Sequence, residues 1–278
     1  QETIHRFQTL LEVTPRAVVC DLHPKYNSTV VAEELGYPVL KVQHHYAHIL
    51  SCMTENDCQE PVIGVAFDGT GYGTDGTVWG GEILLADYEN FTRFGSITPF
   101  LQIGGDASAK EGWRIAVSMI YGYTKDREKA WKIIEKLGLC SEQESKVQFT
   151  MADRRINAVV STSVGRLFDA VSAILGIRRQ SSFEGEASIA LEFAAEAYEQ
   201  HSLQKQKGYQ DHLLYKEDGR LILNTQTLVQ KITEAKLQGT DSGRLAYLFH
   251  QTLAEQITAA CMEARNVSGR QKVALSGG

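Results

Sequence analysis

Residues 62–76, VIGVAFDGTGYGTDG, decide the fold of this chain. The apolar run from Val62 to Phe67 is long enough for a buried β-strand, and it ends at Asp68 in a glycine-rich turn. Residues 77–87 and 91–97 are also typical of strands and are separated from their neighbours by turns. Three consecutive strands joined by turns predict an antiparallel meander.

The preceding segment predicts a different unit. Residues 17–20 and 38–42 have the composition of short buried strands, and residues 25–35 predict a helix that ends at Gly36. A strand, a helix and a second strand in this order predict two parallel neighbouring strands. A further helix is expected over residues 43–54.

The rest of the chain is mainly helical. Helices are expected where apolar residues recur at spacings of three and four, or where alanine is abundant: residues 113–120, 164–175, 186–200 and 245–261. Residues 203–240 are mixed and predict a small insertion, and residues 272–275 predict a last strand. The alternation of strands and helices indicates an α/β fold.

Composition disfavours several classes of protein. The chain has 278 residues, 43% hydrophobic and 22% charged, which is ordinary for a soluble globular protein. Its net charge of -6 disfavours nucleic acid as a partner, because phosphate binding needs clustered lysine and arginine. The five cysteines form no C-x-x-C pair, which disfavours a disulfide framework and favours reduced thiols in the cytoplasm. We expect no signal peptide and no membrane span.

A histidine pair provides the first candidate site. His44 and His48 are four residues apart, so the helix expected from residue 43 presents them on one face. Two neutral imidazoles at this spacing can bind one divalent metal at about 2.0–2.1 Å. The metalloprotease pattern H-E-x-x-H is absent, because residue 45 is histidine. The alternative is a helix that holds histidines without a ligand, but the spacing favours a metal.

The glycine-rich turn provides the second candidate site. Asp68 at the end of a buried strand can bind a metal or a metal-bound water. The glycines that follow allow backbone N–H groups to approach phosphate oxygens. A hairpin turn would need the same glycines, so the turn alone does not decide between the two interpretations. The preceding histidine pair favours the phosphate loop.

Three weaker motifs lie further along. Arg166 and Asp169 fall off the apolar stripe of their helix; composition favours a surface ion pair, and a ribose contact at Asp169 is the alternative. Gly185 could let a ligand approach closely, although the glutamates around it also suit the start of a helix. Residues 276–278, Ser-Gly-Gly, follow a strand, which is the context of a nucleotide loop.

Together these motifs resemble the C-terminal carbamoyltransferase domain of the HypF family, which is related to the threonylcarbamoyl-adenosine tRNA-modifying proteins. The matching motifs run in the family's order over nearly the whole chain: Asp21-Leu22-His23-Pro24, residues 42–48, residues 68–82, Gly104-Gly105-Asp106, Trp113-Arg114, residues 165–169 and residues 275–278. The resemblance implies the α/β fold of actin, Hsp70 and the sugar kinases, built from ribonuclease-H-like lobes. Residues 1–60 would be the remainder of the N-terminal lobe. Residues 61–278 would be the second lobe, with a helical insertion over about residues 101–240, and both ends are expected to be truncated.

The resemblance also implies the chemistry. His44, His48 and Asp68 would bind iron or zinc and would be the catalytic residues. The implied nucleotide contacts are Gly69, Thr70, Gly71, Tyr72, Asp169, Gly185, Ser276, Gly277 and Gly278. The implied donor is carbamoyl-adenylate, made from carbamoyl phosphate and ATP with Mg²⁺. The implied acceptor is a cysteine thiolate of the maturation protein HypE, and the product is the precursor of the cyanide ligands of nickel–iron hydrogenase.

Other functions stay open at this point. A small-molecule O-carbamoyltransferase or a tRNA threonylcarbamoyltransferase would share the superfamily, although the charge of -6 disfavours tRNA. An actin-like ATPase or sugar kinase rarely places His-x-x-x-His beside its phosphate loop. An alternative of another class is a non-catalytic fragment that docks a partner.

Overall fold

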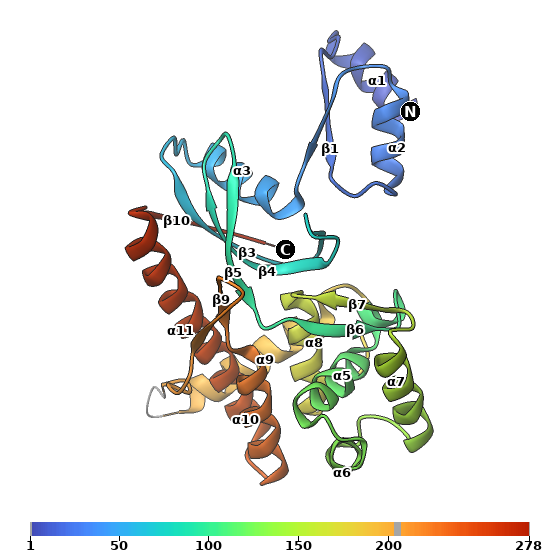
Figure 1. Ribbon diagram of the computed structural model, residues 1–278, viewed down its shortest axis with the longest axis vertical. Helices are drawn as coiled ribbons and strands as arrows, with labels where there is room; N and C mark the ends of the chain where they lie inside the picture. Colours follow the sequence, from blue (N-terminus) through green and yellow to red (C-terminus); the bar gives the residue numbers. More distant parts are fainter. Residues whose placement is uncertain (1, 203–206, 278) are drawn as a thin grey trace.

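The computed structural model describes residues 2–202 and 207–277 of the chain. In Figure 1 the N-terminal segment, in blue, lies at one end of the molecule and most of the helices lie at the other. A curled sheet lies between these two groups.

The N-terminal segment contains the predicted pair of parallel strands. Val18 lies opposite Val39 and Asp21 lies opposite Val42, which confirms the strand–helix–strand prediction. The next helix begins directly after the second strand, at His44. The elements are α1 (Glu2–Leu11), β1 (Val18–Asp21), α2 (Asn27–Glu34), β2 (Val39–Val42) and α3 (His44–Glu55).

The main sheet has the strand order β10-β3-β4-β5-β9-β8. β3, β4 and β5 are antiparallel neighbours, so the predicted meander is confirmed. The last strand, β10, is parallel to β3 and extends the sheet on the other side. The strands are β3 (Val62–Tyr72), β4 (Val78–Ala86), β5 (Phe91–Ile97), β8 (Leu214–Glu217), β9 (Arg220–Leu223) and β10 (Lys272–Ser276).

A largely helical segment follows β5. Two short strands in it, β6 and β7, pair antiparallel, and Ser161 of β7 lies opposite Val78 of β4. The helices expected over residues 113–120, 164–175 and 186–200 are all present. The elements are β6 (Phe100–Ile103), α4 (Ala107–Lys110), α5 (Gly112–Thr124), α6 (Arg127–Leu137), α7 (Glu142–Arg154), β7 (Ala158–Ser161), α8 (Val164–Ile174) and α9 (Glu186–His201).

The region expected to be a small insertion, residues 203–240, is part of the main fold where the structure describes it. β9 pairs in parallel with β5, with Ser96 opposite Ile222, and α10 (Thr225–Leu237) contributes Leu228 and Ile232 to the core. That residues 203–240 form a small insertion therefore stays a prediction, although β9 and α10 pack with the main sheet and core. Residues 203–206 lie outside the described residues.

The long helix α11 (Ser242–Ser268) has clear signals at both ends. Asp241 caps its start by accepting a hydrogen bond from the Arg244 amide, and Gly269, with φ 73°, ends it in the left-handed conformation. Within the described residues, no helix combines the length and the apolar character needed to cross a bilayer.

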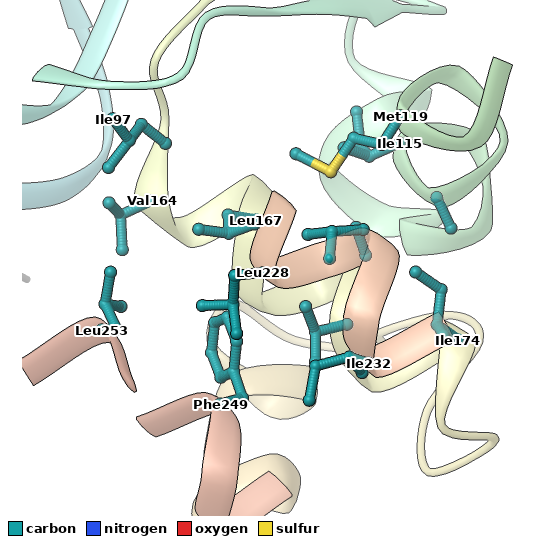
Figure 2. Packing of buried hydrophobic residues seen from close by; sticks show 14 of the residues in the cluster. Ile97, Ile115, Met119, Val164, Leu167, Ile174, Leu228, Ile232, Phe249 and Leu253 are labelled. Carbon is teal, nitrogen blue, oxygen red and sulfur yellow. The ribbon is translucent and has the colours of Figure 1, made fainter. Parts of the chain in front are cut away.

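The core lies on both faces of β3. Ile63 and Val65 belong to a large cluster of buried residues, of which Figure 2 shows a part formed by Ile97 of β5 and by residues of α5, α8, α10 and α11. Val62 and Ala66 belong to a smaller cluster that includes residues of α3. Since alternate residues of a strand point to opposite faces, one strand holds the two clusters together. Asp68 lies further along the same strand, so its backbone is anchored between the two clusters.

Candidate functional site

The start of α3 positions the two histidines. The Gln43 side chain caps the helix by accepting a hydrogen bond from the Tyr46 amide at 2.9 Å. It also donates to the Tyr72 carbonyl at 3.1 Å, which ties the helix to the end of β3. His44 and His48 lie one turn apart, and their Nε2 atoms are 3.3 Å from each other.

Asp68 meets both histidines. Its Oδ2 lies 2.9 Å from His44 Nε2 and 3.6 Å from His48 Nε2, and its Oδ1 accepts a hydrogen bond from the Gly69 amide at 2.6 Å. The hydrogen bond to Asp68 raises the pKa of His44 and outweighs burial, which lowers it. Burial alone would raise the pKa of Asp68, but the hydrogen bonds from His44 and Gly69 bring it below its usual value. The sequence-predicted residues therefore form one cluster.

The donor atoms of this cluster fit a divalent cation. Within the described residues, His44, His48 and Asp68 form the only group of three whose ligand atoms all lie within 4.8 Å of one another. When His44 carries its proton on Nδ1, three lone-pair-bearing atoms converge at the site, and a cation would stabilise this arrangement. Two imidazoles and one carboxylate are suitable ligands for zinc or ferrous iron.

His45, unlike its two neighbouring histidines, is packed inside the protein and does not face the cluster. Its side chain is fully buried, and Nδ1 lies 3.1 Å from Gln43 Nε2. Burial lowers the pKa of His45 to about 3, so the ring is neutral at physiological pH. We therefore do not place His45 among the ligands.

The cluster opens into a cavity of about 610 Å³. The cavity is lined by residues of α3, β3, α4 and α8 and by the loop before α9, and two of its side chains are basic, Lys110 and Arg166. Lys110 and Arg166 can hold an anion, and the carboxylates of Asp68 and Glu184 line the same cavity. Lys110 carried no prediction from the sequence, and Arg166 was predicted only as the partner of Asp169. A single basic residue carries no signal of its own before the fold brings it to the cavity.

Half of the predicted phosphate loop faces this cavity. Gly69 and Thr70 line it, whereas Gly71 packs behind it against His44 and His45. A Cβ atom at Gly71 would lie 2.4 Å from His45 Cε1, so glycine is required there by packing. Tyr72 contacts the ring of His23 edge-on, with ring centroids 4.8 Å apart.

Asp169 is buried beside Arg166. Its Oδ2 lies 3.0 Å from Arg166 Nη2, but the two atoms do not meet hydrogen-bond geometry, and the side chains are only 7% and 12% exposed. The ion pair favoured by composition is thus present but is not on the surface. Burial raises the pKa of Asp169 to about 6, against the lowering effect of Arg166. Of this pair, Arg166 lines the cavity and Asp169 is not among its described lining residues.

The remaining predicted contacts lie around the cavity. Gly185, with φ 80°, begins α9 directly after the cavity-lining residue Glu184. Ser276 Oγ lies 3.4 Å from His48 Nδ1, which places the end of β10 beside the histidine pair. Gly277 packs so closely on the Phe67 carbonyl that a Cβ atom would lie 1.6 Å from its oxygen. Gly278 lies outside the described residues.

A buried ion pair between β4 and β5 was not predicted from the sequence. Arg93 Nε donates to Glu82 Oε2 at 2.7 Å, and its guanidinium lies 4.0 Å from the centre of the Trp79 ring. Glu82 is fully buried and also accepts a hydrogen bond from Thr162 Oγ1 at 2.5 Å. These contacts join β4 to β5 and to the start of α8. The alternation pattern of β4 could not reveal a buried glutamate, because it predicts apolar residues on that face.

Comparisons with known proteins agree with this architecture. A family model described as the second subdomain of the carbamoyltransferase Kae1-like domain matches residues 64–278, and one described as the HypF Kae1-like domain matches residues 1–55. The carbamoyltransferase HypF of Rhizobium leguminosarum bv. viciae is 34% identical over 280 residues, which cover 100% of this chain and 34% of the relative. A carbamoyltransferase HypF homolog of Cupriavidus necator is 35% identical over 95% of this chain and 66% of its own length.

A solved structure is similar over the whole chain. The crystal structure of full-length HypF in the phosphate- and nucleotide-bound form matches with a TM-score of 0.89 and 34% identity, covering 100% of this chain and 42% of that one. The predicted α/β fold class is therefore confirmed. The chain spans about a third of the length of the Rhizobium relative. The chain belongs to the HypF family of carbamoyltransferases and corresponds to the Kae1-like domain of its members.

Proposed function

We propose that this chain transfers a carbamoyl group from carbamoyl-adenylate to a cysteine thiolate of a HypE-like maturation protein. The observation that carries the proposal is the convergence of His44, His48 and Asp68 at one end of a cavity that also holds two cations. Membership of the HypF family supports the same reaction class. The product would be the precursor of the cyanide ligands of nickel–iron hydrogenase.

The chain's own residues would bind and orient the donor. Lys110 and Arg166 would neutralise the phosphate of the adenylate, and Gly69 leaves room for an oxygen because nothing lies within 4 Å of the place of its absent Cβ atom. An iron or zinc ion bound by the cluster would supply Lewis-acid stabilisation of the phosphate or carbonyl oxygen. Enclosing the mixed anhydride in the cavity would limit its hydrolysis.

The nucleophile would come from the partner protein. The thiolate sulfur attacks the carbamoyl carbon, the new C–S bond forms, and the bond from that carbon to the phosphate oxygen breaks to release AMP. Two of this chain's own thiols are poorly suited, because burial raises the pKa of Cys140 to about 11 and also raises the pKa of Cys261. The thiolate, rather than the thiol, is the reactive form of cysteine.

The nucleotide would extend from Gly69 and Thr70 toward the loop before α9. The related HypF crystal structure in a phosphate- and nucleotide-bound form supports a nucleotide site, and we propose that the nucleotide is adenine-based and supplied as ATP with Mg²⁺. Asp169, Gly185 and the Ser276–Gly278 segment stay as predicted contacts. Calorimetry should show that Asp169→Ala weakens nucleotide binding by about 1–3 kcal/mol if its carboxylate accepts from the ribose; unchanged affinity removes Asp169 from the nucleotide site.

The transfer itself can be tested by mass spectrometry. The full-length protein that carries this chain is incubated with ATP, carbamoyl phosphate and HypE, and HypE is then weighed. We expect one added carbamoyl group with the wild type, and at least about tenfold slower transfer for the His44→Ala/His48→Ala variant. His5→Ala is the matched control, because His5 is exposed on α1. Transfer to a sugar hydroxyl in place of HypE would instead identify an O-carbamoyltransferase.

A further inference from the structure

Asp21 contacts the His44 ring from the side opposite to the donor cluster. Its Oδ2 lies 3.2 Å from His44 Nδ1, whereas Asp68 and His48 both lie at Nε2, at 2.9 and 3.3 Å. The two nitrogens of an imidazole point in widely different directions. Asp21 therefore cannot bind the same ion as Nε2, and it is absent from the group of converging ligand atoms found among the described residues.

The backbone holds Asp21 firmly in this position. Asp21 is the last residue of β1 and lies opposite Val42, two residues before His44. The Leu22 amide donates to the Val42 carbonyl at 3.1 Å, and Thr29 Oγ1 donates to the Asp21 carbonyl at 3.4 Å. The strand pairing of the N-terminal segment thus determines where this carboxylate lies.

The carboxylate is also held by its own second oxygen. Asp21 Oδ1 accepts a hydrogen bond from the His23 amide at 2.7 Å, which leaves Oδ2 facing the imidazole. The Asp21 side chain is only 17% exposed, so little solvent competes for this contact. The orientation is therefore built into the fold, independently of any ligand.

We infer that Asp21 is a positioning residue for the metal site. It accepts a hydrogen bond from Nδ1–H of His44 and so fixes the tautomer and ring orientation in which the Nε2 lone pair faces Asp68 and His48. Histidine ligands in proteins generally donate their other ring N–H to such an acceptor, and loss of the acceptor typically weakens metal binding 10- to 100-fold. The inference rests on the proposed function, since it assumes that the cluster binds a metal.

The inference also assigns a role to the N-terminal segment. β1 and β2 contribute none of the three ligand atoms, yet through Asp21 they would set the geometry of one of them. A carboxylate at Nδ1 also increases the electron-donating strength of the ring at Nε2, which strengthens its bond to a metal.

Cobalt(II) binding to the 278-residue chain tests the inference. Co²⁺ is titrated against a competing chelator, and its visible absorption reports the coordination geometry as well as the affinity. We expect Asp21→Ala to weaken Co²⁺ binding about 10- to 100-fold and to change the absorption bands. Asp21→Asn should lose less, because an amide oxygen still accepts the hydrogen bond but carries no charge.

The matched control is Glu33→Ala. Glu33 is a carboxylate of the same segment that forms its ion pair with Lys41, at 2.7 Å, and not with a histidine of the cluster, so this variant should bind Co²⁺ as the wild type does. If Asp21→Ala does not fold, as judged by circular dichroism, Asp21→Asn decides alone. Wild-type affinity and spectrum in the folded Asp21 variants overturn the inference. Retention of Co²⁺ by His44→Ala/His48→Ala would instead overturn the metal site itself, so the two failures are distinguishable.

Discussion

Gly69 and Gly71 stand two residues apart in the irregular end of β3, but an added methyl group meets different surroundings at each. Nothing lies within 4 Å of a Cβ atom at Gly69, whereas one at Gly71 would lie 2.4 Å from His45 Cε1 and 2.9 Å from His44 Cβ. A methyl group at Gly71 would therefore displace the helix that carries the histidines. The same residue type serves ligand access at one position and packing at the other.

This difference predicts opposite results for two alanine variants. Gly71→Ala should lower the free energy of unfolding in urea by about 1–3 kcal/mol, as overpacking does. Gly69→Ala should change it by less than about 0.5 kcal/mol. If Gly69 faces a phosphate, however, Gly69→Ala should weaken nucleotide binding in calorimetry. Equal stability of the two variants would contradict the packing argument.

Asp169 should make stability depend on pH. Its pKa is raised to about 6 in the folded protein, against 3.8 for the ordinary carboxyl, so the folded state holds the proton more tightly than the unfolded state. The stabilising effect is full below pH 3.8 and is lost as the pH rises through about 6. Between pH 4 and pH 7 the wild type should lose about 2–2.5 kcal/mol relative to Asp169→Asn, which has no carboxyl group to titrate. Parallel stability curves for the two proteins, measured in urea, would refute the raised pKa.

At the scale of elements, the β4–β5 pair depends on one buried charge pair. Arg93 is the cation within reach of the fully buried Glu82 carboxylate, at 2.7 Å. Removing Arg93 leaves that carboxylate buried without a counter-charge, and such losses typically cost about 3–5 kcal/mol. We therefore expect Arg93→Met to unfold at much lower urea concentration.

The matched double variant isolates the charge. Arg93→Met/Glu82→Gln should recover part of the lost stability, because glutamine keeps the shape and can still accept from Thr162. A double variant less stable than Arg93→Met alone would show that shape, rather than charge, explains the loss.

The sequence predicted those elements whose signals are local. The helix face that joins His44 to His48 follows from their spacing, and the meander follows from three strands separated by turns. β7 and β9 were not predicted, because each is four residues long and depends on partners far away in the sequence. Lys110 could not be assigned for the same reason: only the folding of α4 against the loop before α9 brings it to the cavity.

At the scale of the whole molecule, the predicted boundary near residue 60 stays a prediction. α3 precedes that boundary in the sequence, but its Ile49 and Met53 pack in one cluster with Val62 of β3 and Ala274 of β10. The histidines therefore lie on a helix that connects the N-terminal segment to the main sheet. This arrangement explains why residues from both parts, Asp21 and Asp68, reach the same imidazole.

β3 has a further consequence for dynamics. The strand is buried on both faces between two hydrophobic clusters, and it is hydrogen-bonded on one side to β4 and on the other to β10. Its amide protons should therefore exchange with deuterium only when the whole protein unfolds, whereas those of the exposed β1 residue Val19 should exchange through local opening. A ligand held by Asp68 and His44 would connect β3 to the exposed strand β1 through the contact between His44 and Asp21. In a deuterium-exchange experiment, ligand binding should appear mainly as added protection of residues 18–21. These residues are far in the sequence from β3, the strand that carries Asp68.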